Sequence, residues 1–281
     1  MKKKAKKREL FDVRQLKNHI RNNKAKFTVY VILRLIVISA MIVSVIGGRY
    51  ENLFACTLAL IFFLVPAFVE KNFGIHFPTT LEVVIMLFVF ASVILGEIGG
   101  YYEKVPMWDT MLHTANGFLC AAIGFSLVDV VNRNDKFKFQ LSPLYVAIVA
   151  FCFSMTIGVI WEMFEFSADF FLGTDMQKDF VIHRINSAEL SRHDSISVVS
   201  IENIKEVTVD GIKLDIDGYL DIGLIDTMKD LAVNFIGAIV FSIIGFFYIK
   251  NRGKGNFAKK FIPFIDRENG EKNMSEKSDT Y

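Results

Sequence analysis

Three hydrophobic segments of the chain carry acidic residues, with one histidine and one asparagine, at helical spacing. The three sets are Asp109 with His113, Glu162 with Glu165 and Asp169, and Asp226 with Asp230 and Asn234. Residues three or four positions apart lie on one face of a helix. A charged side chain inside a lipid-embedded helix costs about 2.5–3.5 kcal/mol. We therefore expect the three polar faces to meet inside a helical bundle and to form one shared site.

The composition of this predicted site indicates metal chemistry. So many carboxylates cannot all be ionised in a low-dielectric site, so either protons are shared or a cation is bound. Carboxylates with a histidine and an asparagine suit a divalent cation such as Zn²⁺, Mn²⁺ or Mg²⁺. The predicted metal ligands are Asp109, His113, Asp169, Asp226, Asp230 and Asn234. Glu162 and Glu165 are the predicted catalytic acids, and no motif for an organic cofactor is present.

Simpler interpretations exist for some of these residues. Asp109 and Asp226 sit where helix N-caps belong, and acids are favoured there. Asp169 is also explained as a hydrated acid at the membrane interface. His113 alone is more typical of a hydrogen-bonded buried histidine than of a metal ligand. The residues that resist such explanations lie inside apolar runs: Glu162, Glu165 and Asp230.

The composition is that of a membrane protein. Mean hydropathy is +0.38 and hydrophobic residues make up 52% of the chain. Six apolar stretches are long enough to cross about 30 Å of hydrocarbon as helices. They lie near Phe27–Ile46, Leu53–Val69, Thr80–Leu95, Asp109–Val131, Pro143–Phe170 and Asp226–Ile249. The predicted fold is an all-α membrane domain over residues 27–250 with six transmembrane helices and a small β-rich extracytoplasmic insertion.

Basic residues predict the orientation. Residues 1–26 contain 11 Lys and Arg. More basic residues follow the fourth and sixth stretches: Arg133, Lys136, Lys138, Lys250, Arg252 and Lys254. Because Lys and Arg are enriched in cytoplasmic loops, we expect a multi-pass plasma-membrane protein with both termini cytoplasmic. The expected partners are membrane lipids. The basic tail is explained more simply as a topogenic signal than as a binding site for anionic lipid. Nothing beyond that tail indicates nucleic-acid binding, and protein partners are not identified.

Two regions outside the predicted helices have distinct compositions. Residues 171–225, between the fifth and sixth helices, alternate apolar and polar residues on both sides of Asp210–Gly211. An Asp-Gly pair between two β-rich runs predicts a hairpin. Residues 251–281 are polar and charged, and we expect a disordered cytoplasmic tail.

At the polar residues the chain resembles the YjdF-like family of six-helix membrane proteins. The shared elements are Trp108-Asp109-x3-His113-x3-Gly117, Trp161-Glu162-x2-Glu165, Gly173-x3-Gln177 and Asp226-x3-Asp230-x3-Asn234-x2-Gly237. The resemblance implies a six-helix fold with a shared polar core and no particular activity. Family members often have a short connection from the glutamine to the aspartate. Here the insertion separates Gln177 from Asp226, which leaves open whether Gln177 reaches the site.

Three functions fit these features. The first is a metal-dependent hydrolase or transferase acting on a lipid or lipid-linked substrate, in which the metal activates water. The second is a cation- or proton-coupled transporter, in which intramembrane acids relay the ion. The third is a structural or partner-binding membrane protein whose polar residues only order the bundle. The acids cluster on one side of the membrane, which favours an enzyme or a binding site over a carrier.

Overall fold

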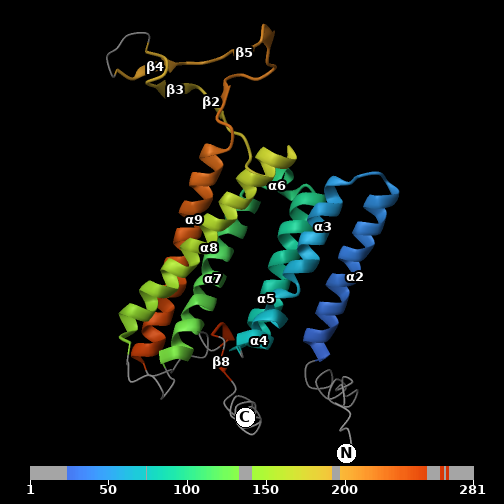
Figure 1. The fold of residues 1–281 in the computed structure, drawn as a ribbon, viewed down its shortest axis with the longest axis vertical. Coiled ribbons are helices and arrows are strands. Elements are labelled where there is room, and N and C mark those ends of the chain that lie inside the picture. Colours follow the sequence, from blue (N-terminus) through green and yellow to red (C-terminus); the bar gives the residue numbers. More distant parts are fainter. Residues whose placement is uncertain are drawn as a thin grey trace, which may run out of the picture.

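The computed structural model describes residues 24–73, 75–132, 141–191, 197–251, 260–262 and 264–265. Within these residues, six helical segments are long and apolar enough to cross a membrane. They run side by side, and the strands of the insertion lie beyond one end of them (Figure 1). The predicted all-α membrane fold with a small β-rich insertion is confirmed. The basic loop at 133–138 and residues 1–23 lie outside the described residues.

The first three spans contain two irregularities. The first span is α2 (Lys24–Ile46), and the second consists of α3 (Glu51–Phe62) and α4 (Val65–Phe73). The break between α3 and α4 precedes Pro66, which has no N–H to donate to the carbonyl of Phe62. The third span begins as α5 (Thr79–Phe90) and continues as the π-helix η1 (Ala91–Ile98). π-Helical turns are rare and are often found at functional sites.

The other three spans form the bundle that holds the predicted site. After the short α6 (Tyr101–Lys104) come α7 (Trp108–Asn132), α8 (Pro143–Leu172) and α9 (Leu224–Lys250). Each of these three helices packs against the other two (Figure 1). Ser142 is the N-cap of α8, and its hydroxyl accepts a hydrogen bond from the Tyr145 N–H at 3.2 Å. Proline occupies the first helical position, where its missing N–H costs nothing. The helix ends at Gly173, which has φ 67°.

Glycines bring the backbones of α7 and α9 into contact. A Cβ at Gly117 would lie 2.1 Å from the Asn234 carbonyl oxygen, and one at Gly237 would lie 2.0 Å from the Thr114 carbonyl oxygen. Small residues at helix interfaces allow this close packing in membranes. The Ser154 hydroxyl of α8 donates to the Gly117 carbonyl at 2.8 Å and joins the third helix to the pair.

Apolar packing completes the two helix groups. Farther along the α7–α8–α9 bundle, the rings of Phe118 and Phe241 meet edge to face at 5.0 Å. The α2, α3 and α5 helices pack around buried residues that include Val37 and Met86. The ring centroids of Phe62 in α3 and Trp161 in α8 lie 6.0 Å apart, so the two groups touch.

The described residues of the insertion form three antiparallel two-stranded pairs. The strands are β2 (Val181–Ile182), β3 (Arg184–Ser187), β4 (Val199–Glu202), β5 (Thr208–Val209), β6 (Ile212–Lys213) and β7 (Tyr219–Leu220). β2 pairs with β7, β3 with β4, and β5 with β6. The predicted hairpin is confirmed, because Val209 pairs with Ile212. Asp210 and Gly211 have φ of 50° and 80°, the positive values that a type I′ turn requires.

The prediction of a disordered tail over residues 251–281 is wrong for a short segment. β8 (Phe264–Ile265) pairs antiparallel with β1 (Ile75–His76). Ile262 is buried in the α7–α8–α9 core, and the Phe261 ring lies 5.5 Å from that of Phe118. The segment is apolar within a polar tail, so it gains free energy by leaving water. The remaining residues of the tail beyond Asn251 lie outside the described parts of the chain.

The orientation can be tested by cysteine labelling. Ala188 lies in the insertion and Asn251 at the opposite end of α9, and both are exposed. In a variant without native cysteines, Ala188→Cys should react with an impermeant thiol reagent on intact cells. Asn251→Cys should react only after permeabilisation. The reverse pattern would place the insertion in the cytoplasm.

The close contact between α7 and α9 predicts a large effect of one methyl group. Gly237→Ala should destabilise the protein by about 1–3 kcal/mol, because a backbone carbonyl oxygen must move to admit the Cβ. Thermal unfolding in detergent measures the effect. Ala232→Val, at an exposed position of the same helix, adds more volume and should leave the melting temperature nearly unchanged. Equal melting temperatures for the two variants would contradict the packing.

Candidate functional site

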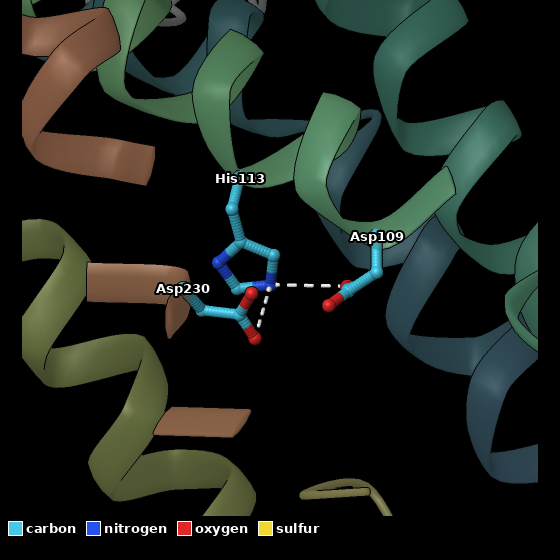
Figure 2. Close-up of side chains that lie close together, drawn as sticks. All are labelled: Asp109, His113 and Asp230. Atoms are coloured by element: carbon cyan, nitrogen blue, oxygen red, sulfur yellow. Dashed lines mark ion pairs between the residues drawn. The ribbon is translucent and has the colours of Figure 1, made fainter. Parts of the chain in front are cut away.

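His113 lies at the centre of the polar residues. It sits one turn after Asp109 on α7, and its Nε2 atom lies 3.4 Å from Asp109 Oδ1. The same nitrogen lies 3.6 Å from Asp230 Oδ2 on α9. Figure 2 shows this nitrogen facing both carboxylates while the other ring nitrogen points away. One side of the imidazole therefore faces two acids from two helices.

The other side of the imidazole faces α8. His113 Nδ1 lies 3.7 Å from Glu162 Oε1. Glu165, one turn further along α8, belongs to the same set, since one ligand atom each from His113, Glu162 and Glu165 lie within 4.8 Å of one another. The atoms of Asp109, His113 and Asp230 meet the same limit. The structure thus brings together residues from three helices that the sequence predicted to converge.

Two carboxylate oxygens of this group are buried without a hydrogen-bond partner. They are Glu162 Oε2 and Asp230 Oδ1, in residues that are 5% and 1% exposed. Buried polar atoms are nearly always hydrogen-bonded, and an unpaired buried charge is costly. The distances from the His113 nitrogens to Asp109, Asp230 and Glu162 are also all longer than a normal hydrogen bond. The imidazole and the three carboxylates thus face one another without forming close hydrogen bonds.

A small cavity opens beside this group. Its volume is about 120 Å³. The lining residues are Glu97, Tyr102, Asp109, Glu165, Met176, Lys178, Phe180, Asp226, Lys229 and Asp230. Glu165 therefore lines the cavity. Glu162 is not a lining residue and lies next to His113 Nδ1. Several lining residues come from the start of the insertion, so the cavity lies at the end of the bundle nearest the strands (Figure 1).

Tyr102 is a lining residue that helical spacing could not identify. It belongs to the short α6, and the absence of a side chain at Gly96 makes room for its ring, since a Cβ there would lie 2.4 Å from Tyr102 Cε2. Burial, together with the nearby Glu97 carboxylate, raises the pKa of the Tyr102 phenol. The hydroxyl thus keeps its proton and can donate a hydrogen bond into the cavity.

Asp169 does not join the group around His113. Its Oδ1 accepts hydrogen bonds from the Thr174 hydroxyl at 2.7 Å and the Met176 N–H at 2.6 Å. Its Oδ2 accepts from the Gln177 N–H at 2.8 Å. Both oxygens therefore fix the chain that leaves α8. Asp169, a predicted metal ligand, thus has a structural role in the connection after α8.

Asp226 and Asn234 lie on either side of Asp230 along α9. Asp226 lines the cavity, and its Oδ2 accepts from the Lys178 N–H at 2.9 Å. Asn234 is fully buried one turn deeper, where its Oδ1 accepts from Asn116 Nδ2 at 3.1 Å. Asn234 therefore ties α9 to α7, a contact with Asn116 that the sequence prediction missed.

The simple capping interpretation of two acids is wrong. The N-cap of α9 is Gly223, with φ 78°, and Asp226 is the third residue of the helix. Asp109 is the second residue of α7 and faces His113. Both acids lie inside the first turn, where the helix dipole still favours a negative charge.

The structure also answers the question about Gln177. Its Nε2 donates to the Thr227 hydroxyl at 2.5 Å. Its Cβ also packs closely on Gly223, where an added Cβ would lie only 2.7 Å from it. The two ends of the insertion meet here, because β2 pairs with β7 and Asp221 accepts the N–H of Phe180 at 2.6 Å. Gln177 therefore reaches the start of α9 despite the long insertion.

Comparison with known proteins places the chain in a family. Residues 29–251 match the profile of a family described as "Predicted membrane protein (DUF2238)". The chain belongs to this family. The match supports the membrane fold, while the YjdF-like name stays a prediction.

A distant relative and the solved structures add little about function. An "Uncharacterized protein" of Thermotoga maritima is 26% identical over 104 residues, which are 37% of this chain and 52% of the relative. The match thus spans about half the length of that protein. No solved structure matches the chain.

The hydrogen bonds of Asp169 predict a structural role. Asp169→Ala leaves two backbone N–H groups unpaired and should cost about 1–3 kcal/mol. Faster proteolysis between residues 173 and 180 should accompany the loss. Asp169→Asn keeps one acceptor oxygen and should cost less. Asp175→Ala, at an exposed site in the same segment, is the control and should behave as wild type.

Proposed function

We propose that Asp109, His113 and Asp230 bind a divalent metal ion. We further propose that the site is the centre of a metal-dependent hydrolase or transferase for a lipid or lipid-linked substrate in the outer leaflet. The observation that carries the proposal is the Asp230 carboxylate. It is 1% exposed, has an oxygen without a partner, and faces the imidazole nitrogen that also faces Asp109.

The ligand types support particular metals. One imidazole nitrogen with two carboxylate oxygens suits Zn²⁺ or Mn²⁺, and Mg²⁺ is the third candidate. Three protein ligands leave coordination positions open, as in catalytic metal sites. A bound ion would supply Lewis-acid polarisation of a substrate oxygen or a water.

The two predicted catalytic acids receive different roles in this proposal. Glu162 faces His113 Nδ1 and would orient the ring, since a histidine ligand commonly donates its second N–H to a carboxylate. Glu165 lines the cavity and would act as the general base that accepts a proton from water there.

The rival functions are less well supported. Coupled transport needs access to the site from both faces of the membrane. Beyond the site, the bundle is packed by aromatic residues that include Phe125 and Phe241, both fully buried. A purely structural role would pair each buried acid with a donor, yet Glu162 and Asp230 each keep an unpartnered oxygen.

Metal content and thermal stability test the proposal together. Purified wild type should carry about one divalent ion, lose it to EDTA and melt earlier. Restoring Zn²⁺, Mn²⁺ or Mg²⁺ at about 100 times the dissociation constant should stabilise the fold by about 2.7 kcal/mol. Asp230→Asn should abolish metal binding and the response to EDTA, because the amide keeps the volume and loses the charge.

A matched variant separates this result from a general effect of charge. Asp215→Asn changes an exposed acid of the insertion and should keep the metal and the EDTA response. If neither EDTA nor added metal changes the melting temperature of wild type, while Asp230→Asn melts earlier, the metalloenzyme proposal is wrong and the acids are structural.

A further inference from the structure

We infer that the cavity beside the metal site binds a phosphate group. This inference rests on the proposed function, because the group would bind between the metal and two lysines. The shared chemistry is the phosphate itself, whether it comes from a lipid headgroup or from free phosphate.

Two lysines from different segments line an otherwise acidic cavity. Lys229 precedes the proposed ligand Asp230 on α9, and Lys178 comes from the start of the insertion. The Lys229 ammonium lies 5.4 Å from the centroid of the Phe180 ring. Among the described residues, no acid forms an ion pair with Lys229. The Lys229 ammonium is therefore not tied to a single carboxylate of the cavity and can turn toward an anion that enters it.

Lys178 is held in a position from which it can turn toward the cavity. Its backbone N–H is fixed by Asp226 Oδ2 at 2.9 Å. Its ammonium donates to the Asp175 backbone carbonyl and pairs with Asp175 Oδ2 at 3.5 Å, and Asp175 is largely exposed. Such an exposed pair contributes little, so the ammonium can leave it for an anion in the cavity. Substitution of the side chain leaves the backbone hydrogen bond in place.

The remaining lining groups complete a site for a tetrahedral anion. Tyr102 offers a phenolic donor, since burial keeps its proton in place. Asp109 and Asp230, which would hold the metal, line the same cavity. Metal ions, lysines and hydroxyl donors are the groups that recognise phosphate oxygens.

The size of the cavity limits what enters it. About 120 Å³ corresponds to roughly four water molecules at about 30 Å³ each. That space is enough for a phosphate group. With a lipid ligand, the headgroup would enter the cavity and the apolar part would stay in the membrane.

The charge of the cavity sets the order of binding. Five carboxylates line it against two lysines: Glu97, Asp109, Glu165, Asp226 and Asp230. Without a metal ion, the carboxylates that stay ionised repel an anion. With a divalent ion bound by Asp109 and Asp230, the metal and Lys229 form a positive side of the cavity. Phosphate binding should therefore require the metal.

The experiment measures binding of inorganic phosphate to purified protein in neutral detergent, by calorimetry, with Mn²⁺ and after EDTA. Wild type with Mn²⁺ should bind phosphate, and chelated protein should not. Lys229→Gln should weaken phosphate binding by about tenfold or more, because one charge-assisted hydrogen bond is lost. The metal content of this variant should be unchanged. Lys213→Gln removes an exposed lysine of the insertion and should bind as wild type.

A second arm identifies the source of the phosphate. Phosphatidic acid and diacylglycerol, each in detergent micelles, differ by the phosphate group. Phosphatidic acid binding more tightly than inorganic phosphate, with no response to diacylglycerol, identifies a lipid headgroup. Equal affinity for phosphatidic acid and inorganic phosphate identifies free phosphate.

Two failures are distinguishable. If metal-loaded wild type binds neither inorganic phosphate nor phosphatidic acid, or if Lys229→Gln binds them as wild type, the inference is overturned and the metal site stands. If no metal binds at all, the proposed function fails and the phosphate inference fails with it.

Discussion

The backbone contact between α7 and α9 is the constraint on which the site depends. Gly117 and Gly237 let the two helices approach without side chains between them. His113 lies one turn from Gly117, and Asp230 lies about two turns from Gly237, at 1.5 Å per residue. At a wider helix separation the imidazole and the carboxylate would not face each other. Asn234, packed at the contact itself, fixes the rotation of α9, so the chemistry is held by rigid elements.

The acids experience different electrostatic surroundings according to their depth. α7 and α9 begin at the site, so the positive ends of two helix dipoles lie there. Asp109 and Asp226 occupy these first turns and benefit from them. Asp230 lies beyond the first turn of α9, and Glu162 lies well inside α8, where this stabilisation has faded. The unpartnered oxygens belong to these two deeper residues. The carboxylate oxygens without a partner thus lie where the helix dipoles contribute least.

Helical spacing in apolar segments was enough to predict the residues that converge. Those residues are Asp109, His113, Glu162, Glu165 and Asp230. Spacing defines a face and hydropathy defines a depth, so helices in a membrane leave few alternatives. The same reasoning misjudged Asp169, because periodicity does not reveal that the next segment folds back and donates its N–H groups. Tyr102 and Lys178 lie in connections, where position depends on local backbone conformation. β1 and β8 are two residues long, which is too short for any periodic signal.

The pairing of β1 with β8 has a consequence for how the protein is assembled. β1 follows α4 early in the chain, while β8 comes after the last span. Because synthesis proceeds from the N-terminus, β1 must wait for its partner until α9 has entered the membrane. Contacts between segments so distant in sequence also form slowly. The first three spans can therefore insert and pack before β8 has been synthesised. Phe261, Ile262 and β8 then join the two helix groups at the end opposite the site, after α9 has entered the membrane.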